Sequence, residues 1–173
     1  MATKLTQLSR EDFRQVSNNR LNDANALFSA GCWVGAYYLA GYSVERVFKA
    51  CIAKDTRAEY YPPSDGKDYY THNFAKLLSL SGLALPSDPE FQLNWKTVVD
   101  WTEEKRYAAV SEETKAEAEK LLGSITDPAK GVLHGYELIG DDYKGDTRGR
   151  VASLQHADEE QLPDQRAFLG GVR

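Results

Sequence analysis

The stretch WVGAYYLAGYSVERVFKAC, residues 33–51, constrains the fold more than any other part of the chain. Large or apolar residues recur there in steps of three and four, at Trp33, Tyr37, Ala40, Val44, Val47 and Cys51. A second series runs beside it, at Val34, Tyr38, Gly41, Glu45, Phe48 and Ile52. This spacing is typical of a helix inside a bundle, and two such seams mean that neighbours cover most of its sides. We therefore predict a central helix over about 32–55, with one polar side formed by Ser43, Arg46, Lys49, Ala53 and Lys54.

Glu45 falls within the second of these seams. A carboxylate in an apolar contact surface is costly unless it is paired and hydrogen-bonded. Lys49 follows one helical turn later in the favourable order, but a lysine can also extend to solvent and leave a rim pair without function. Arg106 and His72 are the alternative partners, from other helices. Two interpretations stay open: a polar contact that fastens the bundle, or part of a binding site.

The remaining periodic segments also predict helices. We expect helices over about 10–30, 72–82, 89–106 and 112–125, with capping residues at Ser9, Thr71, Ser87 and Ser111 and breaks at Gly31 and Pro128. The fold class is therefore all-α, an up-and-down bundle of four to five helices. Residues 1–139 form the bundle, and residues 140–173 lose the periodicity and are expected to be a weakly structured tail with at most a short helix.

Charge and composition restrict the classes of function. The chain of 173 residues has a net charge of −5; residues 1–86 hold 10 Lys and Arg against 8 Asp and Glu, and residues 87–173 hold 11 against 18. An acidic total argues against a broad nucleic-acid-coating surface and leaves room for a local basic patch. No apolar run has the length of a signal peptide core or a membrane span, so a cytoplasmic protein without membrane contact is expected.

Two cysteines are present, Cys32 and Cys51. On one helix they would lie about 30 Å apart, too far for a disulfide. The chain contains no phosphate loop, no Ser–His–Asp signature and no cysteine or histidine spacing typical of a metal site. We expect no cofactor and no metal.

Four separated blocks resemble bacterial proteins of the HEPN domain family. They are GAYYLAGYSVERVFKACIAK (35–54), YTHNFAKLLSLSGL (70–83), NWKTVVDWTEEKRYA (94–108) and GVL (131–133). The resemblance covers about residues 10–135; it departs after GVL, where HGYELI replaces the usual Trp-Ile ending. It implies a bundle built on a long helical hairpin, a homodimer, and binding of a nucleotide or RNA. It also implies a bacterial toxin–antitoxin or defence system, in which a minimal nucleotidyltransferase is a frequent partner.

The candidate ligand-binding residues are Glu45, Lys49, His72, Arg106 and Tyr107. In the family likeness, His72 and the Arg106–Tyr107 pair are the marked polar positions. Arg106 is expected to end the fourth helix, to be oriented by Glu45, and to face a phosphate with its planar guanidinium. His72 is expected to be neutral, because the dipole at a helix start disfavours its protonated form.

Two other features allow alternative functions. The segment 55–71 holds Tyr60, Tyr61, Tyr69 and Tyr70 beside Arg57 and Lys67, which suits either base stacking or packing of the segment over the bundle. Arg150 and His156, with five residues between them, fit the spacing of the metal-independent HEPN ribonucleases, but they lie in the unmatched tail. We therefore commit to no catalytic residue. A non-catalytic protein-interaction bundle is the third alternative.

Overall fold

The computed structural model describes residues 8–56, 59–62 and 69–134, and this part of the chain is all-α. Its elements are α1 (Arg10–Ser29), α2 (Trp33–Lys54), α3 (Phe74–Leu80), α4 (Pro89–Val99), the 3₁₀ helix η2 (Glu103–Tyr107) and α5 (Glu112–Thr126). The only β pairing within the described residues is a single antiparallel bridge between Ser9 and Tyr60. None of the described helices is long and apolar enough to cross a membrane.

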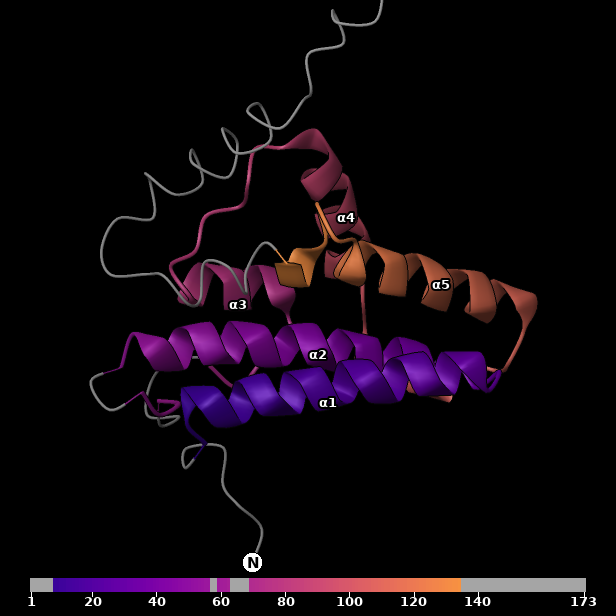
Figure 1. The fold of residues 1–173 in the computed structure, drawn as a ribbon, viewed down its shortest axis with the longest axis horizontal. Coiled ribbons are helices and arrows are strands. Elements are labelled where there is room, and N and C mark those ends of the chain that lie inside the picture. Colours follow the sequence, from indigo (N-terminus) through magenta and orange to yellow (C-terminus); the bar gives the residue numbers. More distant parts are fainter. Residues whose placement is uncertain (1–7, 57–58, 63–68, 135–173) are drawn as a thin grey trace, which may run out of the picture.

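α1 and α2 form a long antiparallel hairpin (Figure 1). The predicted cap of α1 is confirmed, because Ser9 and Asp12 form a reciprocal capping box. Gly31 lies between the two helices with φ of 76°, a conformation that glycine adopts without strain. The two helices also exchange a buried polar contact, in which the Ser17 hydroxyl donates to the Ser43 carbonyl at 2.8 Å.

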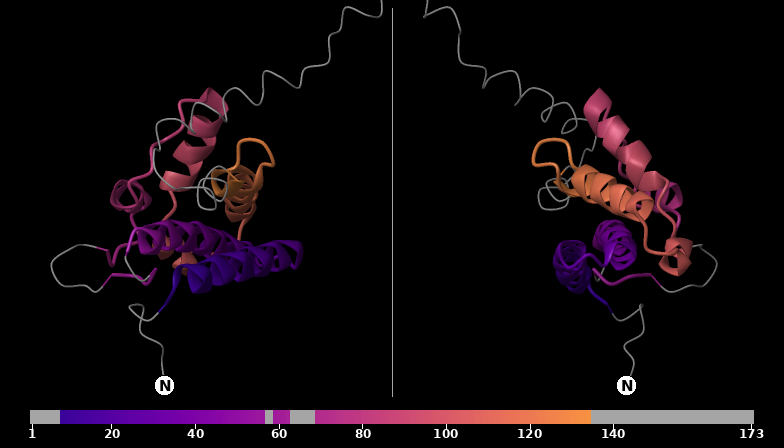
Figure 2. Two further views of the ribbon diagram at one scale, coloured as in Figure 1. Left: turned by 60° about the vertical axis from the view of Figure 1, so that its left-hand side comes forward. Right: turned by 90° about the vertical axis from the view of Figure 1, so that its right-hand side faces the viewer.

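α2 is the central helix, as predicted. It is covered by α1 on one side and by α3, α5 and η2 elsewhere, and Figure 2 shows α5 crossing above the hairpin. Because the neighbours surround it, the predicted polar side of α2 is wrong for Ser43, Lys49 and Ala53, which are all buried. Arg46 is partly buried on the same side.

The chain after α3 differs from prediction in where its helices start and stop. Asn73, not Thr71, caps α3, and Asp88, not Ser87, caps α4. α4 ends at Val99 and does not continue to 106. Thr102 then adopts an extended conformation and caps η2 through its hydroxyl, so the expected single helix is two elements. In Figure 1, α4 is steeply inclined to the hairpin.

Trp101 anchors the chain between α4 and η2 against α2. Its indole N–H donates to the Tyr37 carbonyl at 3.2 Å, and its ring stacks on Phe74 with centroids 5.1 Å apart. A Cβ on Gly41 would lie 2.1 Å from the indole, so only glycine permits this approach. The anchor fixes η2 beside the first half of α2, which decides where Arg106 lies.

Candidate functional site

Glu45 is fully buried and is the centre of a charged cluster. Lys49 Nζ donates to its Oε1 at 2.6 Å, and His72 Nδ1 lies 2.6 Å from its Oε2. Arg46 Nη1 is 3.6 Å from Oε1. The carboxylate therefore faces three basic side chains, and both of its oxygens are engaged.

His72 reaches Glu45 from the segment that leads into α3. The buried Phe74 holds the start of α3 in the core, and the Tyr61 hydroxyl donates to the Tyr69 carbonyl at the beginning of the segment. The Tyr42 ring lies 5.7 Å from the His72 ring. Of the two outside partners that the sequence left open for Glu45, Arg106 and His72, the structure shows His72.

Lys49 is enclosed together with the carboxylate. Its side chain is only 3% exposed, and Nζ lies 5.7 Å from the centre of the Tyr61 ring. Burial lowers the pKa of Lys49, and the charge of Glu45 opposes this shift. The alternative in which Lys49 extends to solvent as a rim pair is therefore wrong.

Arg46 also belongs to the charged cluster, although the helical periodicity predicted that it would lie on the polar side of α2. Its guanidinium carbon lies 5.9 Å from the centre of the Phe13 ring and 5.6 Å from that of Tyr42. Nη1 is buried without a hydrogen-bond partner, since Glu45 at 3.6 Å is too far for one. Sequence alone gives no signal for this residue beyond its place next to Glu45.

Arg106 does not join this cluster, so its predicted ion pair with Glu45 is wrong. Its Nη2 donates to the Tyr107 hydroxyl at 2.9 Å, and its guanidinium carbon lies 5.8 Å from the centre of the Tyr38 ring. Hydrogen bonding to the hydroxyls of Tyr107 and Tyr38 raises the pKa of Arg106. Arg106 and Tyr107 are both exposed, the latter by 76%. Within the part of the chain that the structure describes, no carboxylate forms an ion pair with Arg106.

A row of aromatic rings connects the exposed arginine with the buried cluster. We define the aromatic strip as Tyr107, Arg106, Tyr38, Tyr42 and His72. The Tyr38 and Tyr42 hydroxyls are 3.3 Å apart and their rings 4.8 Å apart. Burial raises the pKa of Tyr42 above its usual range. The two tyrosines were missed as site residues, although their spacing of four on α2 would have placed them on one face.

Some of the other candidate residues pack against the core, and the rest lie outside the described residues. Tyr61 is buried and packs on Phe13 at 5.2 Å, so it supports the packing interpretation of its segment. Tyr60 and Tyr70 are half exposed. Arg57, Lys67, Arg150 and His156 lie outside the described residues, as does the predicted tail. Among the residues that are described, no group of three His, Cys, Asp or Glu side chains could hold a metal ion.

Comparisons with protein families, curated proteins and solved structures find no match for this chain.

Proposed function

We propose that the protein is a non-catalytic module that binds a nucleotide or RNA through the aromatic strip, with Arg106 as the phosphate contact. One observation carries the proposal. The Arg106 guanidinium is exposed, pairs with no carboxylate among the described residues, and lies against the rings of Tyr107 and Tyr38 at 4.7 and 5.8 Å. A guanidinium held in this way presents its free N–H groups to a phosphate at a low cost in side-chain entropy.

The strip also offers rings to the bases. Nucleic-acid bases stack on tyrosine faces, and each such contact contributes about 1–3 kcal/mol without reading sequence. Tyr107 is the most exposed large hydrophobic side chain of the described residues. The Glu45–Lys49 pair is buried and contacts the strip through the Glu45 carboxylate at His72.

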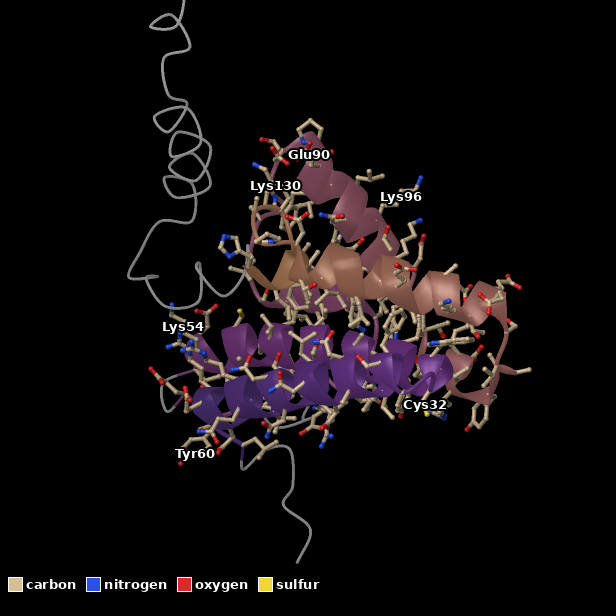
Figure 3. All side chains as sticks on the ribbon, turned by 45° about the vertical axis from the view of Figure 1, so that its right-hand side comes forward. Cys32, Lys54, Tyr60, Glu90, Lys96 and Lys130 are labelled. Carbon is tan, nitrogen blue, oxygen red and sulfur yellow. The ribbon has the colours of Figure 1, made fainter. Side chains whose placement is uncertain are left out.

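The test measures the affinity for a fluorescein-labelled oligouridylate by fluorescence polarisation at low salt. Arg106→Ala is expected to weaken binding about tenfold, because it removes a phosphate contact and a stacked cation. Lys96→Ala is the matched control, since Lys96 is an exposed cation on α4, away from the hairpin (Figure 3). Equal affinities of the Arg106→Ala and Lys96→Ala variants would overturn the proposal.

The biological setting belongs to the same proposal. Three of the four blocks that resemble the HEPN family fall on α2, on and just before α3, and on the second half of α4 with η2, and the fourth, 131–133, follows α5. The setting that this likeness favours is an HEPN-like homodimer in a bacterial two-component system, with a nucleotidyltransferase partner. Light scattering of the purified protein tests the dimer. Co-purification from the native host tests the partner.

A further inference from the structure

On η2 and the first turn of α5, Arg106 is the one cation that has no carboxylate partner among the described residues. Lys105, its neighbour on η2, donates to both carboxylate oxygens of Glu117, at 2.6 and 2.8 Å. Lys115, on the first turn of α5, lies 3.7 Å from Glu112. These two elements therefore leave a single positive charge for a ligand, the guanidinium of Arg106.

Negative charge surrounds this guanidinium. Glu103 and Glu104 belong to η2 as well, and within the described part of the chain their carboxylates have no ion-pair partner. Residues three positions apart in a 3₁₀ helix lie on the same side, about 6 Å apart along the axis, so Glu103 shares a side of η2 with Arg106. A second phosphate placed beside the one on Arg106 would therefore meet a carboxylate.

The aromatic strip also leaves one open ring for a base. Tyr107 is 76% exposed. Tyr38 is only partly exposed, with the guanidinium of Arg106 5.8 Å from its ring centre and the Tyr42 ring at 4.8 Å. The Tyr42 ring in turn packs on Trp101 at 5.6 Å. One open ring and one unpaired guanidinium match one base and one phosphate.

We propose that the site takes a single nucleotide unit, one base with one terminal phosphate, and that Glu103 and Glu104 exclude an extended oligonucleotide from it. This inference rests on the proposed function, because it names the ligand of the same strip. A guanidinium binds a phosphate through two parallel N–H···O bonds, and a terminal phosphate offers it a charge of about −1.5 to −2 at pH 7. A free nucleoside monophosphate and the phosphorylated end of an oligonucleotide share this chemistry.

The experiment compares three unlabelled competitors of the fluorescein-labelled oligouridylate at low salt: UMP, a 5′-phosphorylated decauridylate and a 5′-hydroxyl decauridylate. We expect UMP and the phosphorylated decamer to bind within about threefold of each other, because the rest of the strand finds no further cation. The 5′-hydroxyl decamer should bind at least about threefold more weakly, since each of its phosphates brings a neighbouring phosphate toward the carboxylates.

Two results would contradict the inference. One is a decamer of either kind that binds more than about threefold more tightly than UMP, and the other is a 5′-hydroxyl decamer that binds as tightly as UMP. The phosphorylated decamer distinguishes the two sources of the ligand. Binding equal to that of UMP assigns the site to strand ends as well as to free nucleotides, and weaker binding assigns it to free nucleotides alone.

The salt dependence counts the phosphates independently. A single phosphate contact predicts a slope of about −0.7 for the logarithm of the affinity of the phosphorylated decamer against the logarithm of the salt concentration. A slope of about −1.4 or steeper means two or more contacts and refutes the single unit.

The double variant Glu103→Gln/Glu104→Gln tests the exclusion. It should raise the ratio of the decamer affinity to the UMP affinity at least about threefold, because only the decamer places further phosphates near these side chains. The matched control is Glu59→Gln/Glu90→Gln, which removes the same charge from exposed residues beside the start of α1 and on α4 (Figure 3). The control should leave the ratio unchanged. Equal ratios in the two double variants would show that Glu103 and Glu104 exclude nothing.

Failure of this inference differs from failure of the proposed function. If Arg106→Ala weakens binding but a decamer binds more than about threefold more tightly than UMP, the strip binds the ligand and the limit to one nucleotide unit is refuted. If Arg106→Ala and Lys96→Ala bind alike, the proposed function itself is refuted.

Discussion

Replacing Glu45 by glutamine should destabilise the protein more than any other single change in the charged cluster. The amide leaves Lys49, with a side chain 3% exposed, as a buried cation without its carboxylate. Arg46 loses the same partner at 3.6 Å. Breaking one side of a buried ion pair typically costs about 3–5 kcal/mol, and we expect Glu45→Gln to reduce the free energy of unfolding by that amount at neutral pH.

The geometry predicts an order among the variants. Lys49→Met leaves the carboxylate with His72 at 2.6 Å and Arg46 at 3.6 Å, so its cost should be smaller, about 1–3 kcal/mol. The double variant Glu45→Gln/Lys49→Met removes both buried charges and keeps a similar side-chain volume. It should therefore lie within about 2 kcal/mol of the unmodified protein, well short of the sum of the two single costs.

Urea unfolding, followed by far-ultraviolet circular dichroism and by the fluorescence of the three tryptophans, measures these energies. Arg20→Ala is the control, because its ion pair with Asp23 is half exposed and should contribute less than about 1 kcal/mol. A cost of Glu45→Gln no larger than that of the control would refute the buried pair. So would a larger cost for Lys49→Met than for Glu45→Gln.

The pH dependence of this cost has a definite sign. Burial lowers the pKa of Lys49 in the folded protein, so between that pKa and the usual value of 10.5 the unfolded chain binds more protons than the folded one. Stability from this group therefore rises with pH across that window. Without Glu45, which holds the proton on Lys49, the window widens toward neutral pH. The cost of Glu45→Gln should thus shrink as the pH is raised from about 7 to about 10.

Three further predictions concern other parts of the fold. Gly41→Ala places a Cβ 2.1 Å from a carbon of the Trp101 indole, and it should reduce the free energy of unfolding by at least about 1–3 kcal/mol in the same urea assay. Gly123 lies in α5, where an added Cβ has open space around it, so Gly123→Ala should stabilise the protein by about 0.5–1 kcal/mol. Tyr61→Phe should cost about 1 kcal/mol at neutral pH through its lost hydrogen bond. Burial raises the pKa of Tyr61, so just above about pH 10 the Tyr61 hydroxyl ionises in the unfolded chain but not in the folded protein. The free energy of unfolding of the unmodified protein therefore falls in this range. The Tyr61→Phe variant should lose less stability between pH ~9.5 and ~11. An iodoacetamide titration should modify the exposed Cys32 in the folded protein and leave Cys51, whose thiol pKa burial raises to about 11, unmodified until urea unfolds the chain.

The hairpin and the burial of Glu45 could be predicted because both depend on local periodicity. The apolar residues around Glu45 must be covered by other parts of the chain, so this side of α2 is buried in any arrangement of the remaining helices. Lys49 is one helical turn away, so its contact follows from α2 alone. His72 was one of two outside partners that remained, and a distant contact of this kind cannot be chosen by helical spacing.

The end of α4 could not be predicted from the same pattern. The apolar period continues from Val98 to Trp101, which favours an unbroken helix. The chain instead turns at Asp100, since Trp101 gains a stacked contact on Phe74 and a place over Gly41. These contacts join residues 27 and 60 positions apart in the chain, and a glycine in a helical pattern shows only that a close approach is possible.

This turn explains why Glu45 pairs with His72 and not with Arg106. The indole anchor returns the chain to α2 at Tyr37, and Arg106 consequently lies over Tyr38. Tyr38 and Glu45 are seven positions apart, about 10 Å along the helix axis. Tyr42 lies between them and packs on both Tyr38 and His72. The Arg106 guanidinium therefore stays at the surface, and His72, which precedes α3, contacts the Glu45 carboxylate instead. The buried Glu45 and the exposed Arg106 are therefore apart because Trp101 packs on α2 and Phe74 and ends α4 before Arg106.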